Sequence, residues 1–183
     1  MRVLITAILM LFAASPALAA DWTVDMGQSH LKFQGTQTGG KPFQGEFSRF
    51  TAAISFDPEA LDAAKAHVEV DLKSADSGDK QRDAMMQMKD WLDVRASDKA
   101  IFETTAFQKM DDGSYAAEGN LTLRGVTRPV TLPFTLTIDG DTAHAVGQLT
   151  LHRADFGLGG EKYADDKYVG LDVNVIVDLV ATK

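Results

Sequence analysis

The chain has 183 residues with no cysteine, 26 acidic residues against 18 basic ones, and a net charge of −8 at neutral pH. Without cysteine neither disulfides nor a lipidated cysteine are available, so a packed apolar core has to stabilise the fold. The acidic balance argues against nucleic acid as a partner, because phosphate binding requires a clustered positive surface.

The first 19 residues have the pattern of a secretory signal peptide. Arg2 precedes an apolar run over residues 3–14, and residues 17–19, Ala-Leu-Ala, supply the small-x-small sequence that a signal peptidase recognises. The run is shorter than the about 20 residues that a membrane-spanning helix needs. We therefore expect cleavage after Ala19, export to the periplasm, and one soluble mature domain over residues 20–183.

Alternation of apolar and polar residues recurs along the mature chain, as expected for strands with one buried face. Compact polar turns at 111–113, 124–125 and 139–141 connect neighbouring runs in the manner of hairpins. The pattern predicts a meander of seven to nine antiparallel strands. The runs lie at 22–37, 43–50, 51–57, 66–72, 99–110, 114–124, 130–138, 142–153 and 168–181.

A meander of this many strands commonly closes on itself, because closure removes the unpaired edges of the sheet. At about eight strands the interior is wide enough for side chains or for one small ligand. The sequence therefore predicts an all-β fold, an antiparallel β-barrel of about eight strands with one short helical insert. A β-sandwich is the alternative architecture.

The helical insert is expected over residues 77–94. Ser77 or Asp79 can cap its first amides. Its apolar stripe plugs one end of the barrel as core, as such stripes usually do, or forms a lid over a ligand. Methionines repack easily, which raises the lid hypothesis without deciding between the two. The stripe consists of Ala84, Met85, Met88, Trp91 and Leu92.

The sequence contains no arrangement typical of a catalytic or metal site. The four histidines lie on four different predicted strands, without a second histidine or a cysteine at metal-ligand spacing, and three of them fall on polar faces. The glycines of residues 157–160 lack the lysine of a phosphate-binding loop, and Asp165 and Asp166 lack the ligand spacing of a calcium loop. We expect no enzymatic activity, no cofactor and no metal.

Two segments carry a family resemblance. Residues 119–130 read Gly-Asn-Leu-Thr-Leu-Arg-Gly-Val-Thr-Arg-Pro-Val, and residues 153–158 read Arg-Ala-Asp-Phe-Gly-Leu. With shorter segments at 22–25, 29–33, 43–47, 74–78, 82–83 and 91–93, the last ahead of Phe102, they resemble the YceI-like family of bacterial periplasmic proteins over nearly the whole mature length. Two positions depart from the family pattern: Gln28 stands where members often have histidine, and Ser97-Asp98 replaces a common Tyr-Pro pair.

The resemblance implies a lipocalin-like barrel whose cavity takes long isoprenoid chains, such as polyprenyl or quinone-like lipids. It also implies transient contact with the membrane or with a membrane b-type cytochrome. We therefore predict periplasmic binding, transport or storage of an apolar lipid. The alternative is a non-enzymatic accessory protein with a filled barrel that docks on a membrane redox complex. Monomer and homodimer both remain open.

The candidate ligand-binding residues come from the inward faces of the strands, from the helix and from the late family segment. Each can also be plain core, because periodicity does not distinguish a full interior from a hollow one. Arg153 and Asp155 are expected at the mouth, where they either steer a polar head group or form an ion pair that holds the rim loop. The candidates are Leu31, Phe33, Phe47, Ile54, Phe56, Val68, Val70, Met85, Met88, Trp91, Leu92, Phe102, Leu121, Leu123, Leu132, Phe134, Arg153, Asp155, Phe156 and Leu158.

Overall fold

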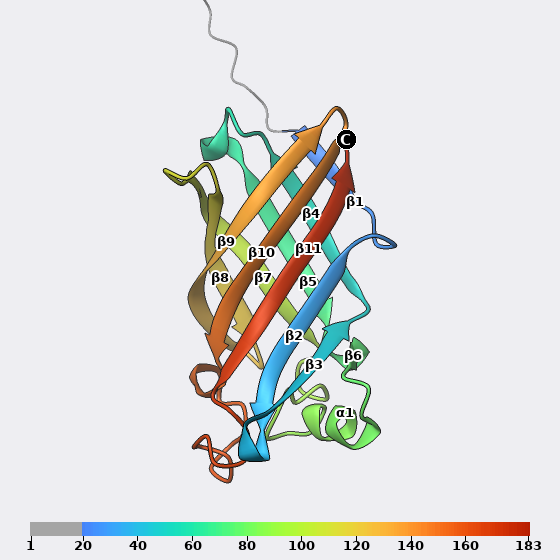
Figure 1. Cartoon of the computed structure of the whole chain (residues 1–183), viewed down its shortest axis with the longest axis vertical. Helices are drawn as coiled ribbons and strands as arrows, with labels where there is room; N and C mark the ends of the chain where they lie inside the picture. Colours follow the sequence, from blue (N-terminus) through green and yellow to red (C-terminus); the bar gives the residue numbers. More distant parts are fainter. Residues whose placement is uncertain (1–19) are drawn as a thin grey trace, which may run out of the picture.

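A computed structural model describes residues 20–183, which form a barrel of tilted antiparallel strands (Figure 1). The predicted signal peptide, residues 1–19, lies outside the described residues. Among residues 20–183, no helix combines the length and the hydropathy needed to cross a membrane. The strands are β1 (Ala20–Val24), β2 (His30–Gln37), β3 (Lys41–Phe47), β4 (Phe50–Phe56), β5 (Lys65–Asp71), β6 (Ala75–Asp76), β7 (Lys99–Lys109), β8 (Tyr115–Leu123), β9 (Val126–Asp139), β10 (Thr142–His152) and β11 (Asp172–Thr182).

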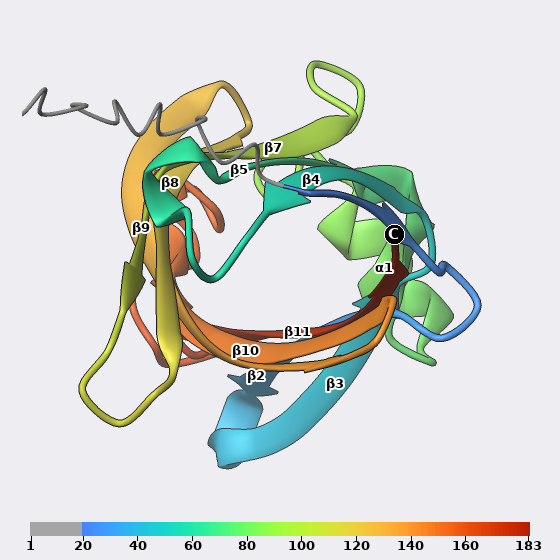
Figure 2. The same cartoon turned by 90° about the horizontal axis from the view of Figure 1, so that it is seen from above.

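The first six strands occupy three positions in the barrel, with two strands in each. β1 and β2 both pair antiparallel with β11, as in Thr23 with Thr182 and Leu31 with Val177. β4 pairs with β1 and β3 with β2, and in the next position β5 pairs with β4 and β6 with β3. With β7 to β11 these positions make a closed ring of eight, visible from above in Figure 2. The predicted antiparallel meander barrel is confirmed.

The predicted strand run 22–37 is wrong in one respect, because it is interrupted at residues 25–29. The carboxylate of Asp25 accepts hydrogen bonds from the amide of Gly27 at 2.9 Å and from the side chain of Gln28 at 2.6 Å. This local turn draws the chain out of the ladder, as an aspartate side chain commonly does. β11 also begins later than the predicted run 168–181, since the preceding residues belong to a loop.

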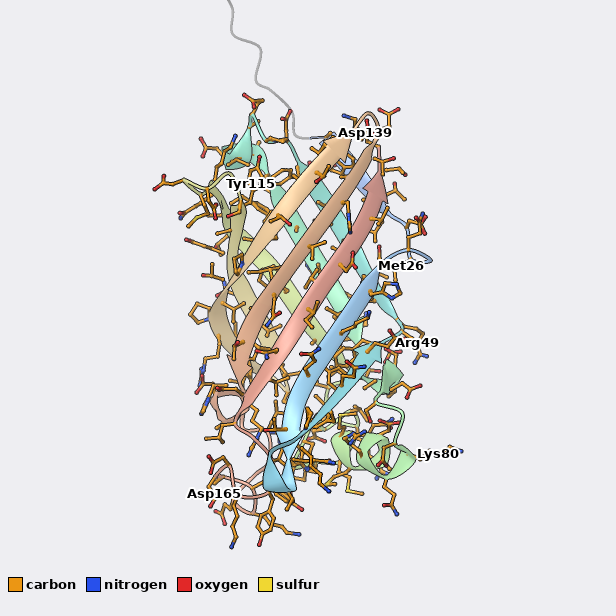
Figure 3. All side chains as sticks on the ribbon, viewed as in Figure 1. Met26, Arg49, Lys80, Tyr115, Asp139 and Asp165 are labelled. Atoms are coloured by element: carbon orange, nitrogen blue, oxygen red, sulfur yellow. The ribbon has the colours of Figure 1, made fainter. Side chains whose placement is uncertain are left out.

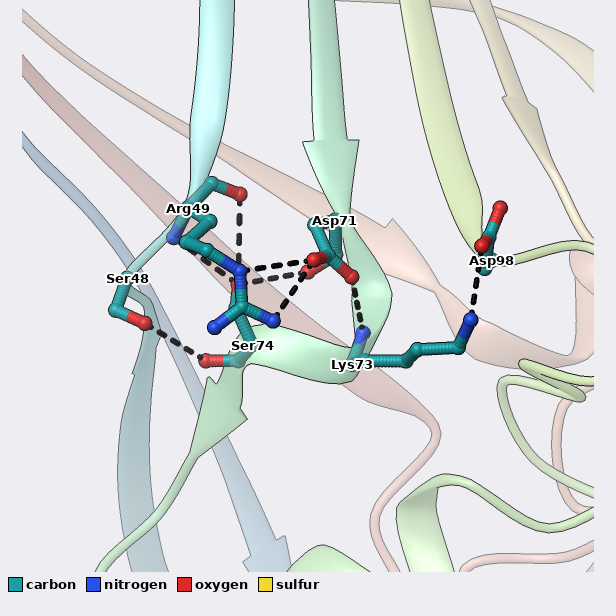
Figure 4. A network of polar contacts seen from close by, with 6 residues as sticks. All are labelled: Ser48, Arg49, Asp71, Lys73, Ser74 and Asp98. Atoms are coloured by element: carbon teal, nitrogen blue, oxygen red, sulfur yellow. Dashed lines mark hydrogen bonds and ion pairs between the residues drawn. The ribbon is translucent and has the colours of Figure 1, made fainter.

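A network of side chains satisfies the backbone where β3 gives way to β4 and β5 to β6 (Figure 4). The hydroxyl of buried Ser74 accepts from the amide of Arg49 at 3.1 Å and donates to the carbonyl of Asp71 at 2.7 Å. Arg49 also donates twice to the Asp71 carboxylate, at 2.8 and 2.9 Å. Burial raises the pKa of Asp71, but hydrogen bonds from Arg49 and the Lys73 amide outweigh it, so the pKa lies below its ordinary value. Buried backbone groups freed by the breaks therefore keep partners.

The helix α1 (Lys80–Met86) is shorter than predicted. Asp79 caps it as expected, accepting from the amides of Gln81 at 2.9 Å and Arg82 at 3.2 Å. The prediction of a helix as far as residue 94 is wrong, since the chain after Gln87 forms turns.

Beyond the end of α1, the carbonyl groups of Lys89 and Asp90 have partners elsewhere in the molecule. The carbonyl of Lys89 accepts from the guanidinium of Arg124 at 2.7 Å, and the carbonyl of Asp90 accepts from the amide of Gly159 at 2.5 Å. Asp93 then adopts a left-handed conformation, with φ of 47°. Contacts with a distant loop therefore override the helical periodicity of the sequence.

Two apolar clusters fill the ends of the barrel. Tyr115 and Asp139 mark the upper end in Figure 3, and Lys80 and Asp165 mark the lower end. We call the two clusters the upper cluster and the lower cluster. The upper cluster consists of Trp22, Phe56, Ala64, Tyr115, Ala143 and Ala181, and the lower cluster of Leu72, Val94, Ala100, Leu123 and Phe156.

Candidate functional site: an apolar cavity in the barrel

A cavity of about 350 Å³ lies inside the barrel. Its lining comes from the inward faces of strands in all eight positions of the ring, together with Met86, Trp91 and Leu92 below them. Almost every lining side chain is apolar, and the exceptions are Thr104 and Arg153. Small-molecule sites commonly measure roughly 300 to 1,000 Å³, so the cavity lies at the low end of that range. The interior is partly hollow.

Most of the predicted site residues are brought together around this cavity, and for those on strands the alternation assigns the inward face correctly. Those that line it are Leu31, Phe33, Phe47, Ile54, Phe56, Val68, Val70, Trp91, Leu92, Phe102, Leu121, Leu123, Leu132, Phe134, Arg153, Phe156 and Leu158.

Three predicted residues do not line the cavity. Met88 has 59% of its surface exposed, and Met85 is partly buried, whereas Met86 takes the inward position. The helix ends before Met88, so the helical spacing used in the prediction no longer applies there. Asp155 is exposed. It follows Arg153 by two residues in a 3₁₀ turn (Arg153–Phe156), which carries the two side chains to different sides of the turn.

Several lining residues were missed, although the same alternation contains them. On β3, Phe43 is in phase with Phe47, and on β11 five apolar residues alternate toward the interior. Met86 has no such signal, because its inward position depends on where the helix ends. The missed residues with large side chains are Trp22, Phe43, Phe50, Leu72, Met86, Phe107, Leu136, Ile138, Leu149, Leu151, Val169, Val173, Val175, Val177 and Leu179.

Arg153 holds the loop between β10 and β11. Only 2% of its surface is exposed, and its guanidinium donates to the carbonyls of Leu158 and Gly170 at 2.8 Å and of Asp165 and Val169 at 2.9 Å. Burial lowers the pKa of the guanidinium, while the negative charge of Asp165 opposes that shift. The expected ion pair with Asp155 is wrong, because backbone carbonyls take the donors of Arg153 instead.

Arg124 ties the same loop to the segment after α1. It donates to the carbonyl of Lys89 at 2.7 Å and to the carbonyls of Phe156 and Gly157, and its Nε is buried without a hydrogen-bond partner. The rings of Trp91 and Tyr163 make a second contact between these two segments, with centroids 5.4 Å apart. We call α1, residues 87–98 and residues 153–171 the lower cap, since together they lie across the lower end of the barrel (Figure 1).

The four histidines lie on the outer face, each beside a carboxylate. Their side chains are 44 to 50% exposed, consistent with the predicted solvated positions. Within residues 20–183 no three potential metal ligands gather into a site. The pairs are His30 with Glu46 at 3.9 Å, His67 with Glu103 at 3.2 Å, His144 with Asp178 at 2.7 Å and His152 with Asp172 at 3.2 Å.

The fold and the cavity define a closed antiparallel barrel with an apolar lumen. The sequence profile of the YceI-like domain matches residues 22–181, and the chain belongs to that family. The resemblance seen in the sequence is therefore confirmed. A UPF0312 protein of Yersinia pestis (strain Pestoides F) is 36% identical over 134 residues, which are 72% of this chain and 69% of the relative. A UPF0312 protein of Pseudomonas aeruginosa (strain LESB58) is 34% identical over 156 residues, 81% of each chain.

Solved structures give the same fold. The crystal structure of Burkholderia cenocepacia BcnA matches with a TM-score of 0.82 and 31% identity, covering 87% of this chain and 99% of that one. A polyisoprenoid binding domain from Saccharophagus degradans, implicated in plant cell wall breakdown, matches with a TM-score of 0.70. It covers 91% of this chain and 99% of its own, but at 16% identity the likeness speaks for the fold alone.

Proposed function

We propose that the protein is a non-enzymatic periplasmic carrier that binds a long-chain lipid of the isoprenoid class and transports or stores it. The observation that carries the proposal is the cavity, whose lining is almost entirely apolar. Such a lumen offers a hydrocarbon chain removal from water without requiring hydrogen bonds. The Saccharophagus degradans neighbour, described as a polyisoprenoid binding domain, supports the same class of ligand.

The energetics favour exchange with membranes. Burying a methylene group is worth about 0.8 kcal/mol against water, so two or three isoprene units supply on the order of 8 to 12 kcal/mol before the cost of immobilisation. A bilayer offers the chain an equally apolar environment, so most of this term cancels when the lipid comes from a membrane. Only shape fit and head-group contacts then favour the protein. We therefore expect modest affinity relative to a bilayer, and loading and release at a membrane surface.

The lower cap is the proposed gate. None of its segments belongs to the ring of eight strands. They are held by hydrogen bonds from Arg124 and Arg153 to backbone carbonyls, by the packing of Val94 and Phe156 in the lower cluster, and by one isolated bridge between Val169 and Gln37. The lower cap can therefore move while the barrel stays intact. Because the chain has no native cysteine, spin labels can be placed at Lys162→Cys and Met88→Cys, with Val146→Cys on the barrel wall as control. We expect lipid loading to change the mobility of the first two labels only, and unchanged spectra at both would count against the gate.

The alternative, an accessory protein with a filled barrel that docks on a membrane b-type cytochrome complex, has less support, because the interior contains a cavity.

Native mass spectrometry of the mature protein from its own periplasm, followed by lipid extraction, tests the proposal. We expect a stoichiometric apolar adduct. Ala145→Phe should abolish it, because residue 145 lines the cavity, whereas Val146→Phe on the outer face of the same strand should retain it. A clean unliganded mass for the wild type, unchanged when polyprenyl alcohols or quinones are offered, would overturn the carrier function.

A further inference from the structure

Three glycines on the inner wall of the barrel each lie beneath a phenylalanine ring. Gly45 and Phe33 face each other across β2 and β3, and Gly35 and Phe43 do so two residues further along the same pair. On the opposite side of the ring of strands, Gly119 of β8 lies diagonally across from Phe102 of β7, within reach of an aromatic side chain. All three rings line the cavity.

The rings occupy the space that a side chain at each glycine would need. A Cβ atom at Gly35 would lie 2.9 Å from Cζ of Phe43, and one at Gly119 would lie 2.6 Å from Cε2 of Phe102. At Gly45 it would meet the Phe33 ring and also the carbonyl of Asp76 at 2.6 Å. These separations are shorter than real Cβ atoms show. Each ring therefore rests against the backbone of the neighbouring strand, an arrangement that glycine alone permits.

The placement of the rings bears on the width of the lumen. A phenyl ring that rests on a glycine lies along the wall, whereas a ring displaced by even a methyl group has to move toward the axis. The Phe43 ring has a second neighbour that limits its movement, since the guanidinium of Arg82 lies 4.8 Å from the ring centroid. In a cavity of about 350 Å³, one displaced ring removes a substantial share of the space.

We propose that Gly35, Gly45 and Gly119 set the width of the lumen and thereby admit a methyl-branched chain. This inference rests on the proposed function. A polyprenyl chain has a methyl branch on every isoprene unit and is wider than a straight alkyl chain. Narrowing the lumen should therefore exclude a polyprenyl chain before it excludes a straight one.

Gly35→Ala is the most direct variant, because the three nearest atoms to a new Cβ there all belong to the Phe43 ring. At Gly45 and Gly119 the new atom would also meet backbone carbonyls, which would disturb strand pairing. We expect Gly35→Ala to weaken binding of geranylgeraniol at least tenfold in a native mass spectrometry titration, and binding of hexadecanol much less. Gln34→Ala, on the outer side of the same strand, is the matched control and should bind both as the wild type does.

A rescue separates the width of the lumen from damage to the strand. In Gly35→Ala/Phe43→Leu the smaller side chain should restore geranylgeraniol binding. Phe43→Ala alone widens the lumen and should bind geranylgeraniol in preference to hexadecanol more strongly than the wild type does. This variant tests the proposal independently if Gly35→Ala does not fold.

The outcomes are distinguishable. A wild type that binds neither alcohol would overturn the proposed function itself. A wild type that binds both, with no change of preference in Gly35→Ala or in Phe43→Ala, would overturn only the role of the glycines. Equal loss of both ligands without rescue would do the same, since it would make Gly35 a purely structural residue.

Discussion

At the upper end of the barrel the seal consists mainly of side chains that belong to the strands, whereas at the lower end it consists of loops and a short helix. The ring of Phe56 lies 5.1 Å from that of Phe107, 5.6 Å from Tyr115 and 6.3 Å from Phe134, and its carbonyl accepts from the indole of Trp22 at 2.9 Å. Below, Arg124 and Arg153 hold the lower cap through backbone carbonyls.

We propose that the upper end is a permanent seal and that the lower end can open. Apolar side chains on paired strands come apart only when the barrel itself opens. Segments that lie outside the paired strands can detach in a smaller step, because local opening needs far less free energy than global unfolding. The proposed entrance is therefore the lower end.

The largest expected effect is at the upper end. Phe56→Ala removes the central ring of the upper cluster and should lower the free energy of unfolding by about 4 kcal/mol, in the range for truncating a buried phenylalanine. Urea denaturation measures this free energy of unfolding. Met110→Ala, at an exposed position, is the control, and its free energy of unfolding should stay within about 0.5 kcal/mol of the wild-type value. A similar small loss for Phe56→Ala would mean that the upper cluster does not stabilise the barrel.

A smaller and more local effect is expected for Arg153→Met. The change leaves buried carbonyls without donors and should lower the free energy of unfolding by about 3 kcal/mol. Hydrogen bonds to charged groups are worth roughly 1.5 to 3 kcal/mol each, but water partly replaces those that are lost. Hydrogen exchange should rise over residues 157–171 and stay unchanged in β7, β8 and β9. Arg153→Lys should behave similarly, because one ammonium cannot reach the same four carbonyls. A uniform rise over all strands would contradict a separable cap.

The smallest expected effect concerns acid pH. Hydrogen bonds from the amides of Arg82 and Gln81 hold the pKa of Asp79 below its ordinary value of 3.8. A carboxylate with a lowered pKa contributes stability that is complete above the ordinary value and is lost as the pH falls through the lowered one. Exchange of the α1 amides should therefore accelerate below about pH 4 relative to that of the strands. In Asp79→Asn this pH dependence should largely vanish, and an unchanged acid response would show that the cap does not govern it.

The barrel was predictable because each strand has one face in the apolar interior and one in water, as in β9, where Leu132 and Phe134 alternate with threonine and proline. The breaks in the early strands were not predictable from alternation. They depend on polar groups such as Asp25 and Ser74, which bond to backbone inside otherwise regular runs. Such bonds compete with the sheet without altering its hydrophobic pattern.

The site divides in the same way. Residues on strands were assigned to the cavity correctly, whereas Met88 was wrong because α1 ends before it, and the carbonyl groups of the following turns bond to Arg124 and Gly159. Gly35 and Gly119 were overlooked, although both are in phase with inward residues. Glycine in a strand is usually taken as a weak position, and its partner ring is known only once the register is known.

The pairing of β11 with β1 and β2 has a consequence for how the chain folds. Every other neighbouring pair in the ring joins residues at most 40 apart, such as Thr142 with Thr182, but Ser29 bonds to Val180 across 151 residues. The sheet can therefore grow strand by strand, yet it cannot close until the last residues of the chain are present. We expect closure to be the slow step of folding, with Trp22 as its reporter, because β1 finds its second partner only then.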